Sequence, residues 1–381
     1  MDGGRANISD KEYETYHQRF RRIFRYGSGE PPPTHYLPGN HDIGMIYNEF
    51  FVTQRLGTSV WFSDRADERY TSHFGPQNQI IDVENHTLVL IDAPSLVEEE
   101  EERTYRGQTY ELWAAHNPKG TVAFLRSLGS QQHSLSTVLF THIPLARPDD
   151  APCGPLRERG TIRSGRGFGY QNTLAPQTSQ FLLQTTRPSL VLSGDDHDYC
   201  EYEHTYNDIV TETLVNVTEV TVKTFSMAMG VRIPGFELLS LSPNTQSSVE
   251  AVATSPCFLP DQLGIYLSTY VPFVIFSLLL LFVSNAHRVR TRGRFVSWAP
   301  LPLWLQSLPR GCAVTARGRR LRVTFPLQEL VDVDRDETVF ATKTESRMRA
   351  RRGLLHGWLA EVVRVAWMPL ICFVIIAWHV S

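Results

Sequence analysis

The sequence predicts a layered α/β domain followed by two apolar segments that could cross a membrane. Three observations support this prediction. Short apolar strands alternate with helical patterns in the first part of the chain, polar clusters follow directly behind several strands, and an uncharged 21-residue run begins at Leu263. Alternating strands and helices are typical of an α/β sheet, whose functional groups lie at the carboxyl ends of the strands.

The first predicted element is a helix. The residues at 9–12 (Ser-Asp-Lys-Glu) form a capping-box pattern, and aromatic and aliphatic residues follow at helical spacing to about Tyr26. A short strand is expected at 35–38, a solvated loop at the five consecutive acids of 98–102, and a linker at 255–260. The remaining expected elements are buried strands at 87–91, 137–140 and 190–192, helical patterns at 105–128 and 176–185, and strands at 220–227 and 236–241.

The apolar run at 263–283 is predicted to be a transmembrane helix, because core helices rarely stay apolar all round for this length. A second, Trp-rich run at 362–380 is also predicted to span, and an interfacial helix remains the alternative. The net charge of the whole chain is only -3, but residues 1–284 carry -12 and residues 285–360 carry +9. The positive-inside rule therefore predicts a basic cytosolic loop at 284–360 and a lumenal domain at 1–255.

Three Asn-x-Ser/Thr sequons lie on the predicted lumenal side, and these glycosylation candidates are Asn7, Asn85 and Asn216. Three of the five cysteines lie on the same side, which allows one disulfide and one remaining thiol, and free, buried cysteines are the alternative. A lumenal domain of charge -12 argues against nucleic acid as a partner.

The candidate chemistry lies in three polar clusters: Gly-Asn-His-Asp at 39–42, Thr-His-Ile-Pro at 141–144, and Gly-Asp-Asp-His-Asp at 194–198. A two-metal phosphoesterase needs imidazoles, carboxylates and an amide oxygen to hold two divalent ions about 4 Å apart. The candidate metal ligands are Asn40, His142, Asp195 and His197. His41 is the candidate catalytic residue that protonates or positions the leaving group.

Each cluster also has a simpler interpretation. An isolated Asn-His turn usually makes local hydrogen bonds, and a His before Ile-Pro is often a satisfied core residue. Four polar groups at one strand end are harder to satisfy without a ligand. The three clusters together, in this order, favour a metal site.

This order of motifs resembles that of the calcineurin-like metallophosphoesterases. The stretches at 36–44, 192–201 and 222–230 are similar to the eukaryotic membrane branch that remodels glycosylphosphatidylinositol (GPI) anchors, which includes fungal cell-division-cycle and post-GPI-attachment phosphoesterases. The likeness covers about residues 2–245 and implies a β-sandwich flanked by helices.

The resemblance further implies a phosphodiesterase with two divalent metal ions, manganese first among them, that removes ethanolamine phosphate from the GPI glycan. The implied partners are the GPI glycan or GPI-anchored proteins, and membrane lipids. The implied location is the membrane of the endoplasmic reticulum or Golgi, with two spans and a lumenal catalytic domain.

Two features depart from the family pattern. Asp195 stands where the first His of a Gly-His-x-His motif is usual, and a carboxylate favours manganese or iron over zinc. The opening Met-Asp-Gly-Gly-Arg resembles the tail of the family's second motif, which makes Asp2 the carboxylate that orients His41. We therefore expect the first strand or strands to be missing and one metal site to be incomplete, with His197 as the remaining ligand of the first ion.

From this truncation we expect the chain to bind metal weakly and to hydrolyse little. Two alternatives stay open. One is a non-catalytic membrane pseudoenzyme, and the other is a less selective phosphatase that uses the same site.

Overall fold

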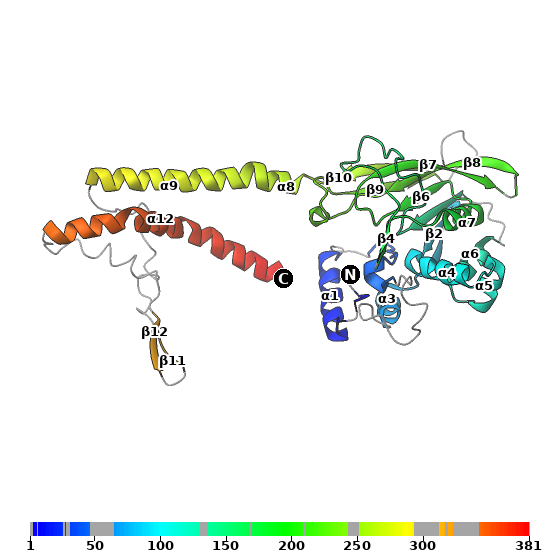
Figure 1. The fold of residues 1–381 in the computed structure, drawn as a ribbon, viewed down its shortest axis with the longest axis horizontal. Coiled ribbons are helices and arrows are strands. Elements are labelled where there is room, and N and C mark those ends of the chain that lie inside the picture. The colour runs from blue at the N-terminus through cyan, green and yellow to red at the C-terminus, as the bar shows by residue number, and fades with distance from the viewer. Residues whose placement is uncertain are drawn as a thin grey trace. The chain divides into compact units, whose positions relative to one another are not determined.

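The computed structural model describes residues 3–5, 7–25, 27, 31–45, 65–129, 136–167, 169–208, 210–242, 251–292, 312–316, 319–323 and 343–380. The chain forms two compact units, Met1–Leu263 and Gly264–Ser381 (Figure 1). The first unit combines a mixed sheet with helices, as the sequence predicts. The second contains the two apolar helices.

A six-stranded sheet with the strand order β1-β2-β3-β6-β8-β7 forms the centre of the first unit. Its strands are β1 Gln79–Val83, β2 His86–Ile91, β3 Ser136–Thr141, β6 Leu190–Ser193, β7 Cys200–Asp208 and β8 Thr213–Thr221. The four inner strands are parallel, and β1 and β7 pair antiparallel at the two edges. The carboxyl ends of the inner strands therefore meet at one edge of the sheet, where α/β proteins place their ligands.

Helices cover one face of this sheet. They are α4 Ala93–Tyr105, α5 Tyr110–His116, α6 Thr121–Gly129 and α7 Pro176–Thr186 (Figure 1). Their apolar side chains, such as Leu96, Leu125 and Leu182, form one buried cluster with Leu139 and Val191 of the sheet. Because side chains alternate between the faces of a strand, the neighbours of Leu139 and Val191 point the other way.

That opposite face is covered by a hairpin of β9 Gly235–Leu241 and β10 Val252–Phe258. Val138 and Leu192 of the large sheet cluster there with Leu239, Leu241 and Val252 of the hairpin. Two sheet layers thus face one another, with helices outside the larger one. Short additional elements are the pair β4 Arg166–Gly167 and β5 Tyr170–Gln171, and a 3₁₀ turn at Met227–Met229.

The N-terminal part contributes α1 Asp10–Ile23, α2 Asn40–Ile43 and α3 Ala66–Phe74. The predicted helix start is confirmed, because the Ser9 side chain accepts a hydrogen bond from the Glu12 N–H. The buried Arg69 guanidinium of α3 bonds the carbonyls of Gly3 and Ile8 and the Asp10 carboxylate. It fastens the segment before α1 to α3.

Several element predictions are wrong. Residues 35–38 form no strand, and β8 ends at Thr221 rather than continuing toward 227. The acidic run at 98–102 lies within α4 and is not a loop. Glu99 there accepts hydrogen bonds from the Trp113 indole and from two backbone N–H groups, which compensates the burial of its carboxylate. Most of the expected linker at 255–260 lies in β10.

Helix α8 Gln262–Ile265 crosses the boundary between the units. The second unit contains a π-helical turn Tyr266–Tyr270, α9 Val271–Arg292 and α12 Lys343–Val380. An antiparallel hairpin of β11 Cys312–Ala316 and β12 Arg319–Val323 lies within the predicted basic loop. The segments Gln262–His287 and Gly357–Ile376 are long and apolar enough to cross a membrane, by length and composition. They contact one another, because Trp358 donates to the Leu278 carbonyl and Asn285 donates to the Leu354 carbonyl.

Candidate metal centre

Three of the four predicted metal ligands converge on one point. The Nε2 atom of His142 lies 3.2 Å from Oδ1 of Asn40 and 3.2 Å from Oδ1 of Asp195. Asn40 is buried in the first turn of α2, His142 directly follows β3, and Asp195 lies two residues after β6. The sheet edge therefore gathers an amide oxygen, an imidazole and a carboxylate from three separate segments.

The orientation of Asn40 is set by its neighbours. Its Nδ2 donates to the Gly169 carbonyl at 2.8 Å, which turns Oδ1 toward His142. Oδ1 also accepts the backbone N–H of His41. The α2 turn itself is closed by Asp42, whose Oδ2 accepts the Gly39 N–H at 3.0 Å.

Gly39 lets the His142 ring approach the backbone of this turn. A Cβ atom at residue 39 would lie 2.8 Å from both Cε1 and Nε2 of His142, which is closer than real Cβ contacts come. The His142 carbonyl accepts the Gly194 N–H at 3.0 Å, which ties the end of β3 to the end of β6. The imidazole is thus enclosed between the α2 turn and the loop after β6.

The loop after β6 has an unusual backbone. Asp195 has a φ of 61° and His197 a φ of 70°, in the left-handed region where non-glycine residues are uncommon. Such conformations cost free energy and persist at sites where the surroundings fix them. Here the Asp196 N–H bonds the Gly194 carbonyl and the Thr224 N–H bonds the His197 carbonyl. The loop is therefore held in the shape that presents alternate side chains to the site.

His197 reaches the same edge of the sheet but stands apart from the other donors. In the part of the chain that the structure describes, the ligand atoms of His142, Asp195 and His197 do not all lie within 4.8 Å of one another. Burial lowers the pKa of His197, against the opposing effect of the Asp195 and Asp196 carboxylates. The ring therefore favours the neutral form that metal ligation requires.

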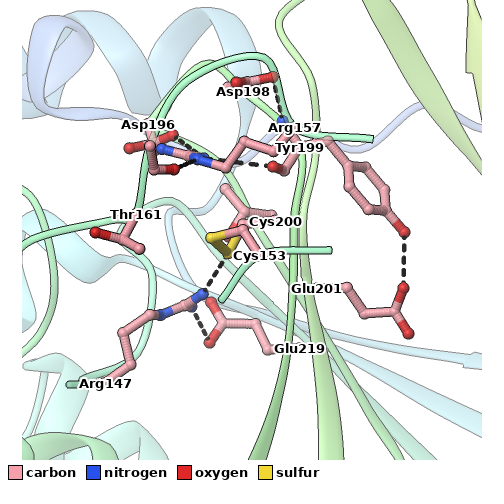
Figure 2. The surroundings of a disulfide bond; sticks show 12 residues. Arg147, Cys153, Arg157, Thr161, Asp196, Asp198, Tyr199, Cys200, Glu201 and Glu219 are labelled. Carbon is pink, nitrogen blue, oxygen red and sulfur yellow. Dashed lines mark hydrogen bonds and ion pairs between the residues drawn. A yellow bond between two sulfur atoms is a disulfide. The ribbon is translucent and has the colours of Figure 1, made fainter. Parts of the chain in front are cut away.

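The two remaining aspartates of the Gly-Asp-Asp-His-Asp segment hold the loop and have their own partners (Figure 2). Asp196 pairs with Arg157 at 2.7 Å. Asp198 is fully buried and accepts the backbone N–H groups of Glu158, Arg159 and Tyr199, with the Lys223 ammonium at 3.3 Å. Burial raises the pKa of Asp198, but these N–H groups and the ammonium together hold it below its usual range.

A disulfide holds the segment that supplies Arg157. Cys153 and Cys200 are bonded, so residues 153–159 are fixed against the start of β7 (Figure 2). Cys257 is a free thiol, so these three cysteines form one disulfide and leave one thiol, and the alternative of free cysteines is wrong for Cys153 and Cys200. Arg157 pairs with Asp196, and Lys223 lies 2.6 Å from Glu158 and 3.3 Å from Asp198. Sequence reasoning missed Arg157 and Lys223 because their roles depend on this loop.

Beneath the disulfide lies a buried ion pair (Figure 2). Arg147 Nη2 is 2.6 Å from Glu219 Oε2, and both side chains are fully buried. Glu219 also contacts His204 Nε2 at 2.6 Å and accepts the Leu145 N–H. The pKa of Glu219 is lowered, because the Arg147 charge and the His204 contact outweigh the effect of burial. This network fixes the chain just after His142.

The other predicted site residues are placed as follows. The His41 side chain is exposed, and its carbonyl accepts the Gly4 N–H at 3.1 Å. The segment that resembles the second family motif thus lies against α2. Asp2 lies outside the described residues. The glycosylation candidates Asn7, Asn85 and Asn216 are all exposed.

The converging donors fit a divalent cation. Two oxygen acceptors face one imidazole nitrogen across 3.2 Å, and a neutral imidazole can donate only one hydrogen there. Carboxylate, amide oxygen and imidazole are ligands that manganese, iron and zinc accept. Asn40 has its amide orientation fixed by the Gly169 carbonyl, as ligands of metal sites usually do through an outer partner.

Several known proteins are similar to this chain. Cell division control protein 1 of Saccharomyces cerevisiae is 32% identical over 272 residues, which cover 68% of this chain and 49% of that protein. Metallophosphoesterase 1 of Cricetulus griseus is 29% identical over 285 residues, covering 73% of this chain and 63% of that protein. Protein TED1 of Saccharomyces cerevisiae is 24% identical over 217 residues, covering 49% of this chain and 39% of that protein.

No protein-family model matches the chain. The matched regions cover less than two thirds of the length of these relatives. These relatives confirm the resemblance to metallophosphoesterases of the GPI-related branch.

Proposed function

This chain belongs to the metallophosphoesterase family, and we propose that it is a membrane-anchored, metal-dependent phosphodiesterase of the secretory pathway. The observation that carries the proposal is the convergence of Asn40 and Asp195 on Nε2 of His142. These residues are proposed to hold one divalent ion, with manganese preferred because Asp195 adds a hard oxygen ligand. His197 is proposed to serve a second ion beside it.

A bound divalent ion would supply Lewis-acid polarisation of a phosphoryl oxygen. The remaining roles are assigned to side chains of the protein. Arg157 pairs with Asp196, which reduces the repulsion of an anionic phosphodiester by that carboxylate. His41 is exposed beside Asn40, and we propose that its ring gives a proton to the leaving oxygen.

The proposed substrate is ethanolamine phosphate attached to a GPI glycan. Support for this part comes from the family branch that the three motif stretches resemble, and no residue of the site selects this ester over another phosphodiester. GPI-anchored proteins and membrane lipids are the corresponding partners. A less selective phosphatase activity at the same site is the second candidate.

Localisation in the endoplasmic reticulum or Golgi is part of the proposal. The Cys153–Cys200 disulfide supports an oxidising compartment for the first unit. The two candidate spans support a membrane anchor, and the basic residues between them favour a cytosolic loop at 284–360. Residues 1–255 would then face the lumen.

The experiment uses the whole chain, purified in detergent and supplied with Mn²⁺. Release of ethanolamine phosphate from a synthetic GPI glycan is followed by mass spectrometry, beside bis(p-nitrophenyl) phosphate as a simple diester and p-nitrophenyl phosphate as a monoester. Because one of the two metal sites is expected to be incomplete, we expect slow, metal-dependent cleavage of the glycan ester and of the simple diester. Both should fall about 100-fold or more in His142→Ala, because a direct ligand is lost.

The control variant is His116→Ala, which removes an exposed histidine at the end of α5. It should retain wild-type rates. Preference for the monoester would favour the less selective phosphatase. Metal binding without cleavage of any of the three esters would favour the non-catalytic alternative and overturn the proposed activity.

A further inference from the structure

A second group of metal-binding side chains lies between α1 and α3, away from the sheet edge. Glu14 and His17 are three residues apart on α1, so they project from the same face of the helix. His73 projects from the last turn of α3. One ligand atom from each of the three residues lies within 4.8 Å of the others.

Hydrogen bonds determine how His73 faces this group. Its Nδ1 lies 2.7 Å from the Arg69 carbonyl oxygen, which can only accept, so Nδ1 carries the hydrogen. In a neutral imidazole Nε2 is then a lone pair. Yet Nε2 lies 3.0 Å from Oε2 of Glu14, which is also an acceptor. Two facing acceptors repel one another unless a proton or a metal ion lies between them.

The Glu14 carboxylate is also oriented by a hydrogen bond. Gln18 donates through Nε2 to Oε1 of Glu14 at 2.9 Å, which leaves Oε2 directed at His73. The His17 ring completes the group, with its centroid 4.5 Å from that of His73 and the two rings nearly perpendicular. An outer partner on both a histidine and a carboxylate is the usual surrounding of metal ligands.

We propose that Glu14, His17 and His73 form a second, separate site for a divalent transition metal of the zinc class. Two imidazoles and one carboxylate are a common three-ligand set for zinc, which leaves one position for water. Donor atoms around one tetrahedral zinc ion lie roughly 3.4 Å apart, given bond lengths near 2.1 Å. The donor atoms of Glu14 and His73 lie 3.0 Å apart, and the His17 ligand atom lies within 4.8 Å of both, so modest side-chain shifts would bring all three to this spacing.

Metal binding between α1 and α3 would affect the stability of this part of the fold and not the reaction itself. Arg69 of α3 bonds the carbonyls of Gly3 and Ile8, which precede α1, and the Gly4 N–H bonds the His41 carbonyl. A metal that links α1 to α3 would stabilise this arrangement against opening. The site therefore supports the turn that carries Asn40 and His41 without contacting substrate.

The test counts bound zinc in the whole chain in detergent. All proteins carry His142→Ala, which disables the centre at the sheet edge, so remaining zinc reports on the α1–α3 site. After equilibrium dialysis against Zn²⁺, we expect one strongly bound equivalent in this background and none after the further change His17→Ala/His73→Ala. Zinc should raise the melting temperature of the first protein and leave that of the second unchanged.

The matched control adds His116→Ala to the same background, removes a histidine outside both sites, and should keep the zinc equivalent. If the double histidine change prevents folding, Glu14→Gln serves instead, because Glu14 lies on the surface and the amide is a weaker ligand. We expect Glu14→Gln to lower zinc affinity about tenfold or more. Equal zinc binding with and without these changes would overturn the proposal, leaving a protonated His73 as the partner of Glu14.

Discussion

Oδ1 of Asn40 lies 3.2 Å from Nε2 of His142, although 102 residues separate them along the chain. The contact joins the first turn of α2 to the carboxyl end of β3. It depends on the Gly169 carbonyl, which orients the Asn40 amide, and on Gly39, which leaves room for the ring. The first prediction concerns this close approach.

Gly39→Ala should displace His142 and weaken metal binding roughly 10- to 100-fold. The added Cβ would lie 2.8 Å from the imidazole, whereas the backbone at residue 39 is extended and accepts alanine. Manganese affinity and melting temperature of the full chain are the measurements. Gly27→Ala is the control, because a Cβ there has no neighbour within 4 Å. Similar affinities in both variants would refute the steric argument.

The buried ion pair of Arg147 and Glu219 should contribute much of the stability of the segment that follows His142. Glu219→Gln leaves the Arg147 charge buried without its partner, so we expect a loss of about 3–5 kcal/mol in the free energy of unfolding at neutral pH. Urea unfolding measures it. A loss below about 1 kcal/mol would show that the pair does not hold this region.

The pH dependence of the same pair has a definite sign. Because the folded-state pKa of Glu219 is lowered, its stabilisation is present above the ordinary value of 4.5 and is lost as the pH falls through the folded-state value. The stability gap between wild type and Glu219→Gln should therefore narrow as the pH drops below about 4.5. A gap that widens on acidification would contradict the assignment.

The disulfide should stabilise the first unit by about 2–4 kcal/mol, since it closes a loop of 47 residues in the unfolded chain. The double change Cys153→Ser/Cys200→Ser should lower the melting temperature. It should also weaken activity, because Arg157 and the loop that holds Asp198 would be less firmly positioned. Cys257→Ala, which removes the free thiol, should change neither property. Unchanged melting temperature in the double variant would argue against a structural role.

The sequons offer a test of topology. If residues 1–255 face the lumen, the exposed Asn7, Asn85 and Asn216 are accessible to the glycosylation machinery. Expression in a eukaryotic cell should then give a product whose mass falls on glycosidase treatment. The triple change of these asparagines to glutamine should abolish that shift. An unmodified wild-type chain would count against a lumenal domain.

Much of the sheet and the site followed from the sequence, because buried parallel strands are uninterrupted apolar runs and each ended in polar residues. The strands at β2, β3 and β6 were predicted in this way, together with the ligand clusters behind β3 and β6. Their meeting at one edge is a consequence of parallel pairing.

Other features depended on tertiary contacts that no local pattern reveals. The acidic run in α4 is helical because Asp92 caps the helix, Pro94 starts it, and Glu99 finds donors from α5 and α6. The strand predicted at 220–227 missed most of β8. The first half of β8, which pairs with β7, mixes polar and apolar residues and is therefore not an uninterrupted apolar run. The supporting roles of Arg157 and Asp198 appear only once the disulfide closes its loop.

The metal centre of Asn40, His142 and Asp195 is tested most directly by the affinity of the full chain for Mn²⁺, measured by electron paramagnetic resonance of the free ion. We expect saturable Mn²⁺ binding that weakens about tenfold or more in each of Asn40→Ala, His142→Ala and Asp195→Ala. The control His116→Ala should bind Mn²⁺ as the wild type does. Equal affinity in the wild type and in all three ligand variants would contradict the proposed metal centre.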